Sequence, residues 1–413
     1  MKKIYSLSFA IISIFFSASF AADISHSSDL IPSNIKAVAK SVTVPGMALS
    51  RDTVHFSWNL NTDTAITAPT PHIAESREFY MDVDAASMRR GVAINTTARG
   101  SVVKLSPSSA GANTKSQPKP KPLSVDDVVV RLGDESIALR DFAARVDDSK
   151  KLTASGVAFA PGSLAFLIDD ARGAASFEVA LKSADRSYLV HVFEPASPNA
   201  LTLTTNRDTY LTGEKLRITA SASNDAAITE ITGGIASPQG ELTAVMFTRN
   251  ADGQFIGSIP LVESTAGALY EAYAVAKLND GSVIALRDAK VSFAVANPTA
   301  RLINVAAAKE RFDAVSFNTR LEIAAAGRYQ VEAVLYAQKD GARVSIAIAH
   351  TGAWLNVGEN VMALQFDHLD LAKRGVEGPF TLGNFALKNQ GNLATMERRM
   401  EVVTSAYGDT SLE

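Results

Sequence analysis

The sequence has no cysteine in its 413 residues, and it has only six histidines and two tryptophans. The absence of cysteine excludes disulfide bonds, thiolate metal sites and cysteine nucleophiles, so the burial of apolar side chains must hold the fold together. An excess of positive charge is also lacking, because the formal net charge is −3. Nucleic-acid phosphates attract clustered lysine and arginine, so this balance argues against a nucleic-acid partner.

Long apolar runs are confined to the amino terminus. Residues 1–21 start with Lys2 and Lys3, continue with an apolar run lightened by serines, and end with small residues at Ser19 and Ala21. This pattern predicts a secretory signal peptide that is cleaved after Ala21. The alternative is a membrane anchor, but the run falls short of the ~20 apolar residues of a spanning helix. We therefore expect an exported protein of the periplasm, the cell surface or the medium, without a transmembrane segment after cleavage.

The rest of the chain alternates apolar and polar residues in short segments, which is typical of β-strands. A serine-rich lead-in at 22–44 precedes a first expected domain at 45–197, in which His55–Leu60 and the stretch from Glu78 to Ile94 are expected to form short strands. A loop rich in proline and lysine at 108–124 interrupts this domain. Its composition is typical of a solvated extended loop rather than a recognition motif.

One segment of the first domain has a helical pattern. Leu139, Phe142, Ala143 and Val146 recur at the spacing of one helix face, so we predict a short helix over 139–152. Two strong strands follow, and a proline-containing linker ends the domain.

A second expected domain spans 198–298, and Leu201–Asn224 is its clearest feature. This segment reads as strand, turn and strand, with Tyr210 placed to fold back over the sheet end and the acidic Asp208 and Glu214 placed to cap the turn. Asp252–Gly253 and Asn279–Gly281 match the chemistry of tight hairpins. The size and strand number match an immunoglobulin-like sandwich.

A third expected domain spans 299–413 and repeats this style. Gly327–His350 reads as one hairpin with its turn at Asp340–Gly341. The sequence therefore predicts an all-β protein, with tandem immunoglobulin-like β-sandwiches preceded by a less regular β-rich domain that contains one short helix.

Two resemblances extend this interpretation. The segment DTYLTGEKL, Asp208 to Leu216, resembles the opening motif of macroglobulin-type and bacterial immunoglobulin-like domains. More broadly, REFYMDVDAASMRRGVAINTTARGSVVKLSP, the middle sandwich, GRYQVEAVLYA and FDHLDLAKRGVEGPFTLGNFAL resemble a family of exported proteobacterial proteins with a domain of unknown function. This resemblance covers most of the mature chain. It implies a multidomain β protein, and it brings no catalytic residues with it.

The motifs of common enzymes are missing. The sequence has no H-E-x-x-H, no G-x-S-x-G, no G-x-x-x-x-G-K-[ST] and no G-x-G-x-x-G. His55 and His191 lie in apolar strands, where half-buried structural imidazoles are expected. His72 and Glu75 form a His-carboxylate pair, but zinc needs a third ligand that the local sequence does not offer.

Ca²⁺ is bound by oxygen ligands alone, so a calcium site is possible in a chain without cysteine. Asp367 and Asp370, at the end of an expected strand, are the candidate Ca²⁺ ligands. Asp82 and Asp84 alternate in an expected strand, where both carboxylates would face the same side. For both pairs the simpler interpretation is solvated carboxylates at a strand edge or turn, and no other cofactor is indicated.

The predicted function is therefore binding or scaffolding without catalysis, for a protein or glycan partner at the cell envelope. Trp58 and Trp354 could form a sugar-binding surface, although core packing is the simpler expectation for both. The rival hypothesis is a secreted glycoside or peptide hydrolase with its site in the first domain. Two carboxylates facing across a cleft there would favour the hydrolase, and an exposed aromatic surface would favour a carbohydrate-binding protein.

Overall fold

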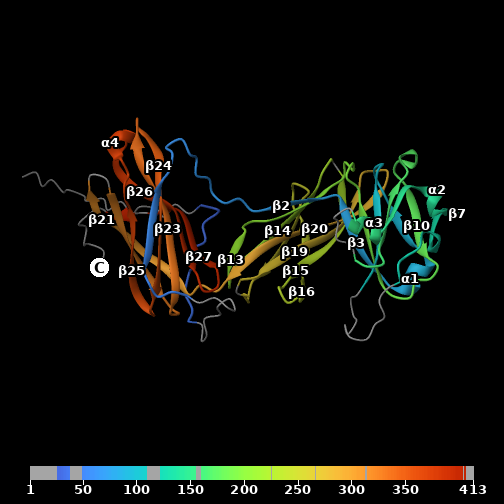
Figure 1. The fold of residues 1–413 in the computed structure, drawn as a ribbon, viewed down its shortest axis with the longest axis horizontal. Coiled ribbons are helices and arrows are strands. Elements are labelled where there is room, and N and C mark those ends of the chain that lie inside the picture. Colours follow the sequence, from blue (N-terminus) through green and yellow to red (C-terminus); the bar gives the residue numbers. More distant parts are fainter. Residues whose placement is uncertain are drawn as a thin grey trace, which may run out of the picture.

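The computed structural model describes residues 26–37, 49–108, 121–154, 160–224, 226–265, 267–311, 314–402 and 404–405. The predicted signal peptide at 1–21 and most of the loop at 108–124 lie outside these residues. In the described part of the chain, the strands form six sheets, arranged as three two-sheet domains in a row (Figure 1). The all-β prediction is confirmed. Among the described residues, no helix is long and apolar enough to cross a membrane.

The first domain lies at one end of the molecule and encloses its own apolar core between two sheets. One sheet has the order β3 (Glu78–Val83), β11 (Tyr188–Phe193), β5 (Val102–Pro107), β9 (Leu164–Ile168) and β8 (Ala143–Asp148). The other has the order β4 (Val92–Asn95), β10 (Ser176–Leu181), β6 (Val128–Leu132) and β7 (Glu135–Ala138). Three short helices accompany them: α1 (Ala85–Arg90), α2 (Leu139–Phe142) and α3 (Ser149–Ala154).

The prediction of one helix over 139–152 is wrong in its centre. Only Leu139–Phe142 and Ser149–Ala154 are helical, and the residues between them form β8, which pairs with β9 in antiparallel register. Leu139 and Phe142 are buried as expected. The pairing with β9 comes from a distant part of the chain and overrides the local helical spacing.

The middle domain is a second pair of sheets around a separate core. One sheet has the order β17 (Phe247–Arg249), β18 (Phe255–Pro260), β14 (Lys215–Ala222), β12 (Leu201–Thr205) and β2 (Ile73–Ser76). The other has the order β13 (Thr209–Leu211), β20 (Ile284–Ala296), β19 (Leu269–Asn279), β15 (Ala227–Ala236) and β16 (Leu242–Ala244).

The turn after β12 follows the prediction in part, because Thr209–Leu211 within it form β13 and the Asp208 carboxylate pairs with Arg398 instead of capping the turn. Tyr210 is fully buried, and its ring packs edge-on against Phe293 with centroids 5.6 Å apart. The Tyr210 hydroxyl donates to Asn206 Oδ1 at 2.8 Å. Glu214 Oε2 accepts a hydrogen bond from the Leu211 amide at 2.6 Å, so this acidic residue caps the turn.

The C-terminal domain lies at the opposite end of the molecule and has the third core. Its larger sheet has the order β1 (Val54–Asn59), β24 (Ala342–Leu355), β23 (Gly327–Lys339), β26 (Glu377–Asn389) and β27 (Ala394–Val402). The facing sheet has the order β25 (Gly358–Phe366), β22 (Ala314–Ile323), β21 (Ala300–Arg311) and β28 (Thr404–Ser405), and α4 (Leu371–Arg374) follows β25.

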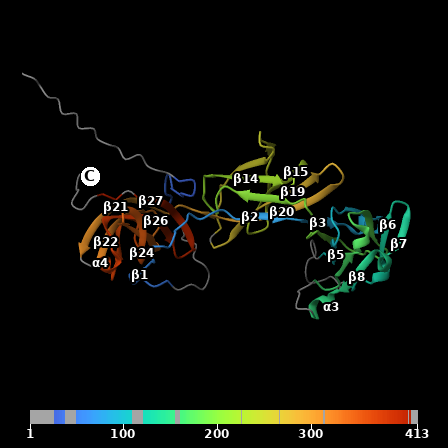
Figure 2. The same cartoon turned by 90° about the horizontal axis from the view of Figure 1, so that it is seen from above.

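The position of β1 corrects the expected organisation. His55–Leu60 was expected to be a strand of the first domain, but β1 pairs with β24 of the C-terminal domain. Ile73–Ser76, further along, pairs with β12 of the middle domain before the chain reaches the first domain. Figure 2 shows β1, β2 and β3 in the three successive domains, so one early segment runs along the whole molecule.

Two arginines hold β1 in place through main-chain oxygens. Arg328 Nη1 donates to the carbonyl oxygens of Ser50 and Asp52, at 2.8 and 2.6 Å, just before β1. Arg374 donates to the carbonyl oxygen of Leu60 just after it, and to that of Ile346 at 2.8 Å. Because the acceptors are main-chain oxygens, these bonds fix the backbone on both sides of β1 and do not involve its side chains.

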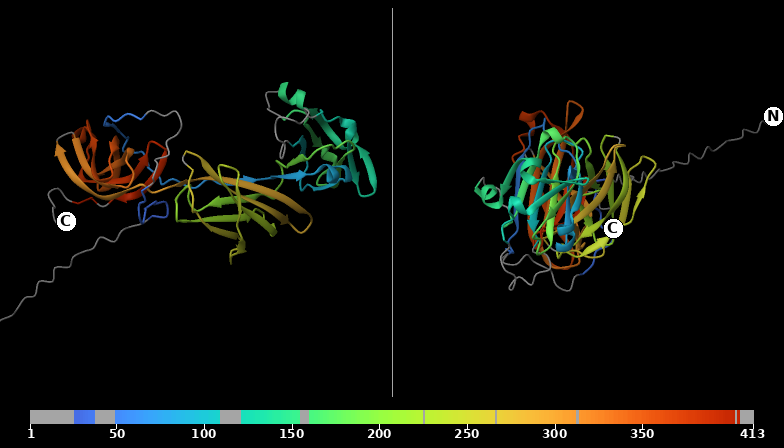
Figure 3. Two further views of the ribbon diagram at one scale, coloured as in Figure 1. Left: turned by 90° about the horizontal axis from the view of Figure 1, so that it is seen from below. Right: turned by 90° about the vertical axis from the view of Figure 1, so that its right-hand side faces the viewer.

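The amino-terminal segment also joins two domains. The Asp29 carbonyl accepts a hydrogen bond from Arg207 of the middle domain at 3.1 Å, and Asp29 Oδ1 accepts one from the Met400 amide of the C-terminal domain at 2.8 Å. Leu30 is buried in the C-terminal core. Figure 3 shows the resulting elongated arrangement of the three domains.

Candidate functional site

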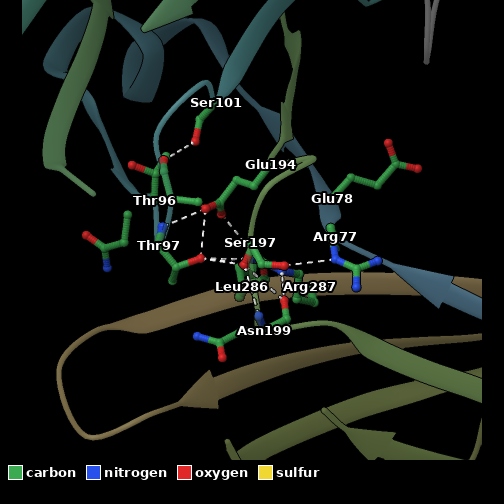
Figure 4. A network of polar contacts seen from close by, with 12 residues as sticks. Arg77, Glu78, Thr96, Thr97, Ser101, Glu194, Ser197, Asn199, Leu286 and Arg287 are labelled. Carbon is green, nitrogen blue, oxygen red and sulfur yellow. Dashed lines mark hydrogen bonds and ion pairs between the residues drawn. The ribbon is translucent and has the colours of Figure 1, made fainter. Parts of the chain in front are cut away.

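A fully buried pair of opposite charges lies between the first and middle domains (Figure 4). Arg287 Nη1 on β20 lies 2.8 Å from Glu194 Oε1, and both side chains have no exposed surface. Arg287 also donates to the carbonyl oxygen of Asn199 at 2.9 Å and to Ser197 Oγ at 2.9 Å. Glu194 Oε2 accepts from the amide and the hydroxyl of Thr97 at 2.5 and 2.9 Å.

This network joins residues of both domains and of the linker between them. A fully buried ion pair is strongly destabilised when one partner is removed, because the other charge stays buried without compensation. A substrate cannot reach side chains that have no exposed surface. We therefore assign Arg287 and Glu194 a structural role in holding the two domains together, and not a catalytic role.

A second group of polar residues lies beside this network. His191 Nε2 lies 2.7 Å from Glu78 Oε2, and the His191 ring stacks on Tyr80 with centroids 4.1 Å apart. The Tyr80 amide donates to Asp288 Oδ2 of the middle domain at 2.7 Å. Burial lowers the pKa of His191, although its hydrogen bond to Glu78 acts in the opposite direction. The expectation that His191 is a half-buried structural imidazole agrees with this setting.

The strongest candidate for a binding surface lies on the larger sheet of the C-terminal domain. Phe56 and Trp58, two residues apart on β1, are 50% and 46% exposed. Their ring centroids are 5.4 Å apart and their planes differ by 11°. His350 on β24 stacks against both rings, with centroids 5.1 Å from Phe56 and 5.0 Å from Trp58. We call these three side chains the aromatic patch.

Polar side chains continue the sheet surface beside the aromatic patch. Glu332 on β23 lies 3.3 Å from His350 Nδ1 and 2.6 Å from Lys388 Nζ on β26. Gln330 Nε2 donates to Glu332 Oε2 at 3.0 Å, and Gln390 Nε2 donates to Gln330 Oε1 at 2.7 Å. The aromatic patch and these polar side chains therefore lie side by side on one sheet.

Electrostatics keep Glu332 ionised at this site. Burial by itself raises the pKa of Glu332, but the hydrogen bonds from His350 and Lys388 and the positive charge of Lys388 outweigh it and lower the pKa to about 2. His350 Nε2 is buried and has no hydrogen-bond partner among the described residues. Such a group costs free energy unless another interaction compensates.

The aromatic patch corrects two predictions. Trp58 was expected in the core, and His55 was expected to be half-buried, but both are exposed because β1 is the edge strand of its sheet. The alternation of Phe56 and Trp58 in HFSWN signals that both rings share one face. No local signal identifies His350 or Glu332 as their neighbours. Trp354 is partly buried, with the Arg51 guanidinium 4.5 Å from its ring centroid.

The predicted Ca²⁺ ligands lie in the segment after β25, beside β1. The Asp367 amide donates to Ser57 Oγ at 3.1 Å, and Asp370 Oδ1 lies 3.4 Å from Lys373 Nζ. Across the described part of the chain, no three histidine, aspartate or glutamate side chains are grouped as metal ligands. The Ca²⁺ site at Asp367 and Asp370 stays a prediction.

The carboxylates of the first expected domain have other roles. Asp84 was expected in a strand beside Asp82, but it is the N-cap of α1 and accepts hydrogen bonds from the amides of Ala86 and Ser87, both at 2.9 Å. Asp82 is exposed. Glu75 forms an ion pair with Arg77. The structure does not bring the His72 side chain into a hydrogen bond or ion pair with Glu75 among the described residues.

Comparison with known proteins gives the chain a family. Residues 45–194 match the N-terminal domain, and residues 299–406 the C-terminal domain, of the domain of unknown function DUF4785. The first match includes β1 and β2, which lie in the other two domains. No curated protein matches the sequence.

Among solved structures, a DUF4785 family protein from Legionella pneumophila is 21% identical, with a TM-score of 0.72 over 91% of this chain and 98% of that one. Titin domains A168–A170 are 14% identical, with a TM-score of 0.19 over 81% and 98% of the two chains. Salmonella alpha-2-macroglobulin is 11% identical, with a TM-score of 0.20 over 79% and 23%. The last two scores are too low to support an argument. The two family matches and the shared fold show that this chain belongs to the DUF4785 family.

Proposed function

We propose that this protein is an exported, non-catalytic binding protein of the bacterial periplasm or cell surface, and that it binds a glycan at the aromatic patch. The signal-like sequence at 1–21 supports export. The stacked, half-exposed rings of Phe56 and Trp58 carry the proposal.

Exposed aromatic rings beside polar groups match the chemistry of a sugar. The C–H faces of a sugar pack on aromatic rings, and its hydroxyl groups take hydrogen bonds from polar side chains at the edge. Gln330 and Lys388 supply such groups next to the rings. The patch also lies on a sheet rather than on a loop, so its geometry is set before any ligand arrives.

The three-domain arrangement supports a scaffolding component of this role. The first and middle domains are joined by the buried pair of Arg287 and Glu194, and the middle and C-terminal domains by Asp29 and by the ion pair of Asp208 and Arg398 at 3.1 Å. These links hold the patch at one end of an elongated molecule, away from the first domain.

A glycan array tests the proposal, with the wild-type chain compared with Trp58→Ala. We expect wild-type binding and about a tenfold loss of affinity in Trp58→Ala, which corresponds to about 1.4 kcal/mol. Phe193→Ala is the matched control, because Phe193 is an exposed aromatic residue, 40% accessible, in the first domain. It should bind as wild type.

Two results would contradict the proposal. One is the absence of glycan binding by the wild type, or binding that is equal in wild type and Trp58→Ala. The other is turnover of glycan or peptide substrates that is abolished by changing Glu75 on β2 of the middle domain or Asp82 on β3 of the first, which would establish the rival hydrolase.

A further inference from the structure

A cleft of about 320 Å³ lies at the junction of the middle and C-terminal domains. Residues of three segments line it: Ser264, Thr265, Gly267, Ala268 and Leu269 before and at the start of β19; Ala294, Val295, Ala296, Asn297 and Thr299 from the end of β20 to the residue before β21; and Asn389, Asn392, Leu393, Ala394 and Thr395 from the end of β26 to the start of β27. Thr209 of β13 completes the lining. We call it the junction cleft. Its volume is at the lower end of the range of ligand sites, which occur often at domain interfaces.

The lining of the junction cleft carries no charge. Its described polar residues are serine, threonine and asparagine, and none of the lining residues is aspartate, glutamate, lysine, arginine or histidine. A charged ligand would lose its hydration there without an opposite charge in compensation. The lining also has no aromatic ring for a sugar to stack on. An uncharged ligand other than a sugar fits these walls best.

The side-chain amide oxygens of two asparagines in the lining already accept hydrogen bonds. Asn297 Oδ1 accepts from Thr212 Oγ1 at 3.0 Å, and Asn392 Oδ1 accepts from the Ala394 amide at 3.1 Å. These bonds fix each amide group and leave its Nδ2, which has no hydrogen-bond partner among the described residues, as a donor. Such donors, one from each side of the junction, suit ligand carbonyl oxygens.

Two leucines from different domains are exposed in the same lining. Leu269 on β19 is 57% exposed, and Leu393 in the turn before β27 is 66% exposed. Leu393 has a φ of 58°, a left-handed conformation that leucine rarely adopts. The turn therefore presents an apolar side chain to solvent in a conformation that glycine would adopt with less strain.

A sheet edge adjoins the junction cleft. β27 is the last strand of its sheet. In the described chain Leu30 bridges it at Arg398, the Met400 amide donates to Asp29 Oδ1 and the Ala394 amide donates to Asn392 Oδ1, so the edge has no strand partner between Ala394 and Arg398. Ala394 and Thr395, at the start of β27, line the cleft. An open sheet edge offers main-chain donors and acceptors to an added extended segment.

We propose that the junction cleft binds a short extended peptide segment of a partner protein, uncharged and with an aliphatic side chain between Leu269 and Leu393. The edge of β27 between Ala394 and Arg398 would pair with the peptide backbone, and the side-chain amides of Asn297 and Asn392 would donate to its carbonyl oxygens. This site is separate from the aromatic patch and goes beyond the function proposed for it.

The test uses a displayed library of random heptapeptides selected on the full chain and depleted on the Leu393→Gly variant. We expect enrichment of uncharged peptides that contain leucine, isoleucine or valine. The best synthetic peptide should then bind Leu393→Gly about tenfold more weakly in calorimetry. The melting temperature of Leu393→Gly should not fall, because glycine accepts the left-handed φ at this position.

Matched controls separate this proposal from its alternatives. Leu242→Gly changes a leucine of β16 that is 69% exposed and outside the cleft lining, and this variant should retain peptide binding. Trp58→Ala should also retain it, so failure at the aromatic patch and failure at the junction cleft give different results. Enrichment of charged peptides, no enrichment dependent on Leu393, or binding of neutral oligosaccharides that Leu393→Gly weakens would overturn the proposal.

Discussion

Arg287 and Glu194 form an ion pair in which both side chains are fully buried and the nitrogen and oxygen lie 2.8 Å apart. The pair joins the middle domain to the end of the first, with Thr97, Ser197 and Asn199 as hydrogen-bond partners. The relative position of the two domains therefore depends on a charge pair that is fully shielded from solvent.

Replacing one partner of this pair should be costly. We expect Arg287→Met to lower the free energy of unfolding by about 3 kcal/mol, because the Glu194 carboxylate stays buried without its counterion. Chemical denaturation measures the loss. The double variant Arg287→Met with Glu194→Leu should recover part of it, and a double variant as unstable as the sum of its parts would contradict the coupling.

The raised pKa of Asp288, at the same junction, predicts that the stability of the protein depends on pH. Burial of its carboxyl group, together with the negative charge of Glu78, raises the pKa of Asp288 to about 6 from 3.8, although the Tyr80 amide acts against the shift. The folded chain therefore binds the proton more tightly than the unfolded chain. The stabilising contribution is fully present below pH 3.8 and is lost as the pH rises through about 6.

Asp288→Asn removes this titration and keeps an oxygen that accepts from the Tyr80 amide. We expect the variant to be more stable than wild type by about 1 kcal/mol above pH 7, after allowance for the partial exposure of the group. The difference should shrink as the pH falls to 4. Denaturation at several pH values measures it, with Asp82→Asn as the exposed control, and a difference that does not change with pH would contradict the assignment.

The two arginines around β1 predict a local effect. Arg328→Met removes charge-assisted hydrogen bonds to the carbonyl oxygens of Ser50 and Asp52, so we expect a loss of about 2 kcal/mol. Hydrogen exchange should become faster in β1 before it does so in β23. Arg320→Met is the control, since Arg320 forms an exposed pair with Glu359 that should contribute less than about 1 kcal/mol.

Gly233 on β15 predicts a packing effect. A Cβ atom at this position would lie 2.2 Å from the Tyr273 carbonyl oxygen and 2.9 Å from Ala274 Cα on β19. Because both contacts are with backbone, Gly233→Ala should lower the free energy of unfolding by about 3 kcal/mol. Gly327→Ala, whose nearest contact would be an ordinary 3.6 Å to Tyr329, should change it little. Equal melting temperatures for the two variants would contradict the prediction.

Calcium gives a final test, at Asp367 and Asp370. An ion bound only by the folded state raises stability by mass action, so Ca²⁺ should raise the melting temperature and a chelator should reverse the rise. Asp367→Asn should remove the difference. A melting temperature that does not respond to calcium would contradict the predicted site.

The sequence by itself determined the local features of this protein. The hairpin at Asp340–Gly341 forms as predicted, with φ of 51° and 77° at these two residues, because aspartate and glycine tolerate positive φ. The turn around Tyr210 and the all-β class follow in the same way from alternation and turn chemistry between neighbouring residues.

Only the tertiary structure decided which distant segments meet. Nothing near Phe56 in the sequence indicates that β1 joins β24, or that His350 stacks against both Phe56 and Trp58. The helical spacing after Leu139 was overridden for the same reason, since β8 pairs with β9. Strand pairing and buried ion pairs depend on residues brought together from far apart in the chain, and a periodicity along one segment contains no information about its partner.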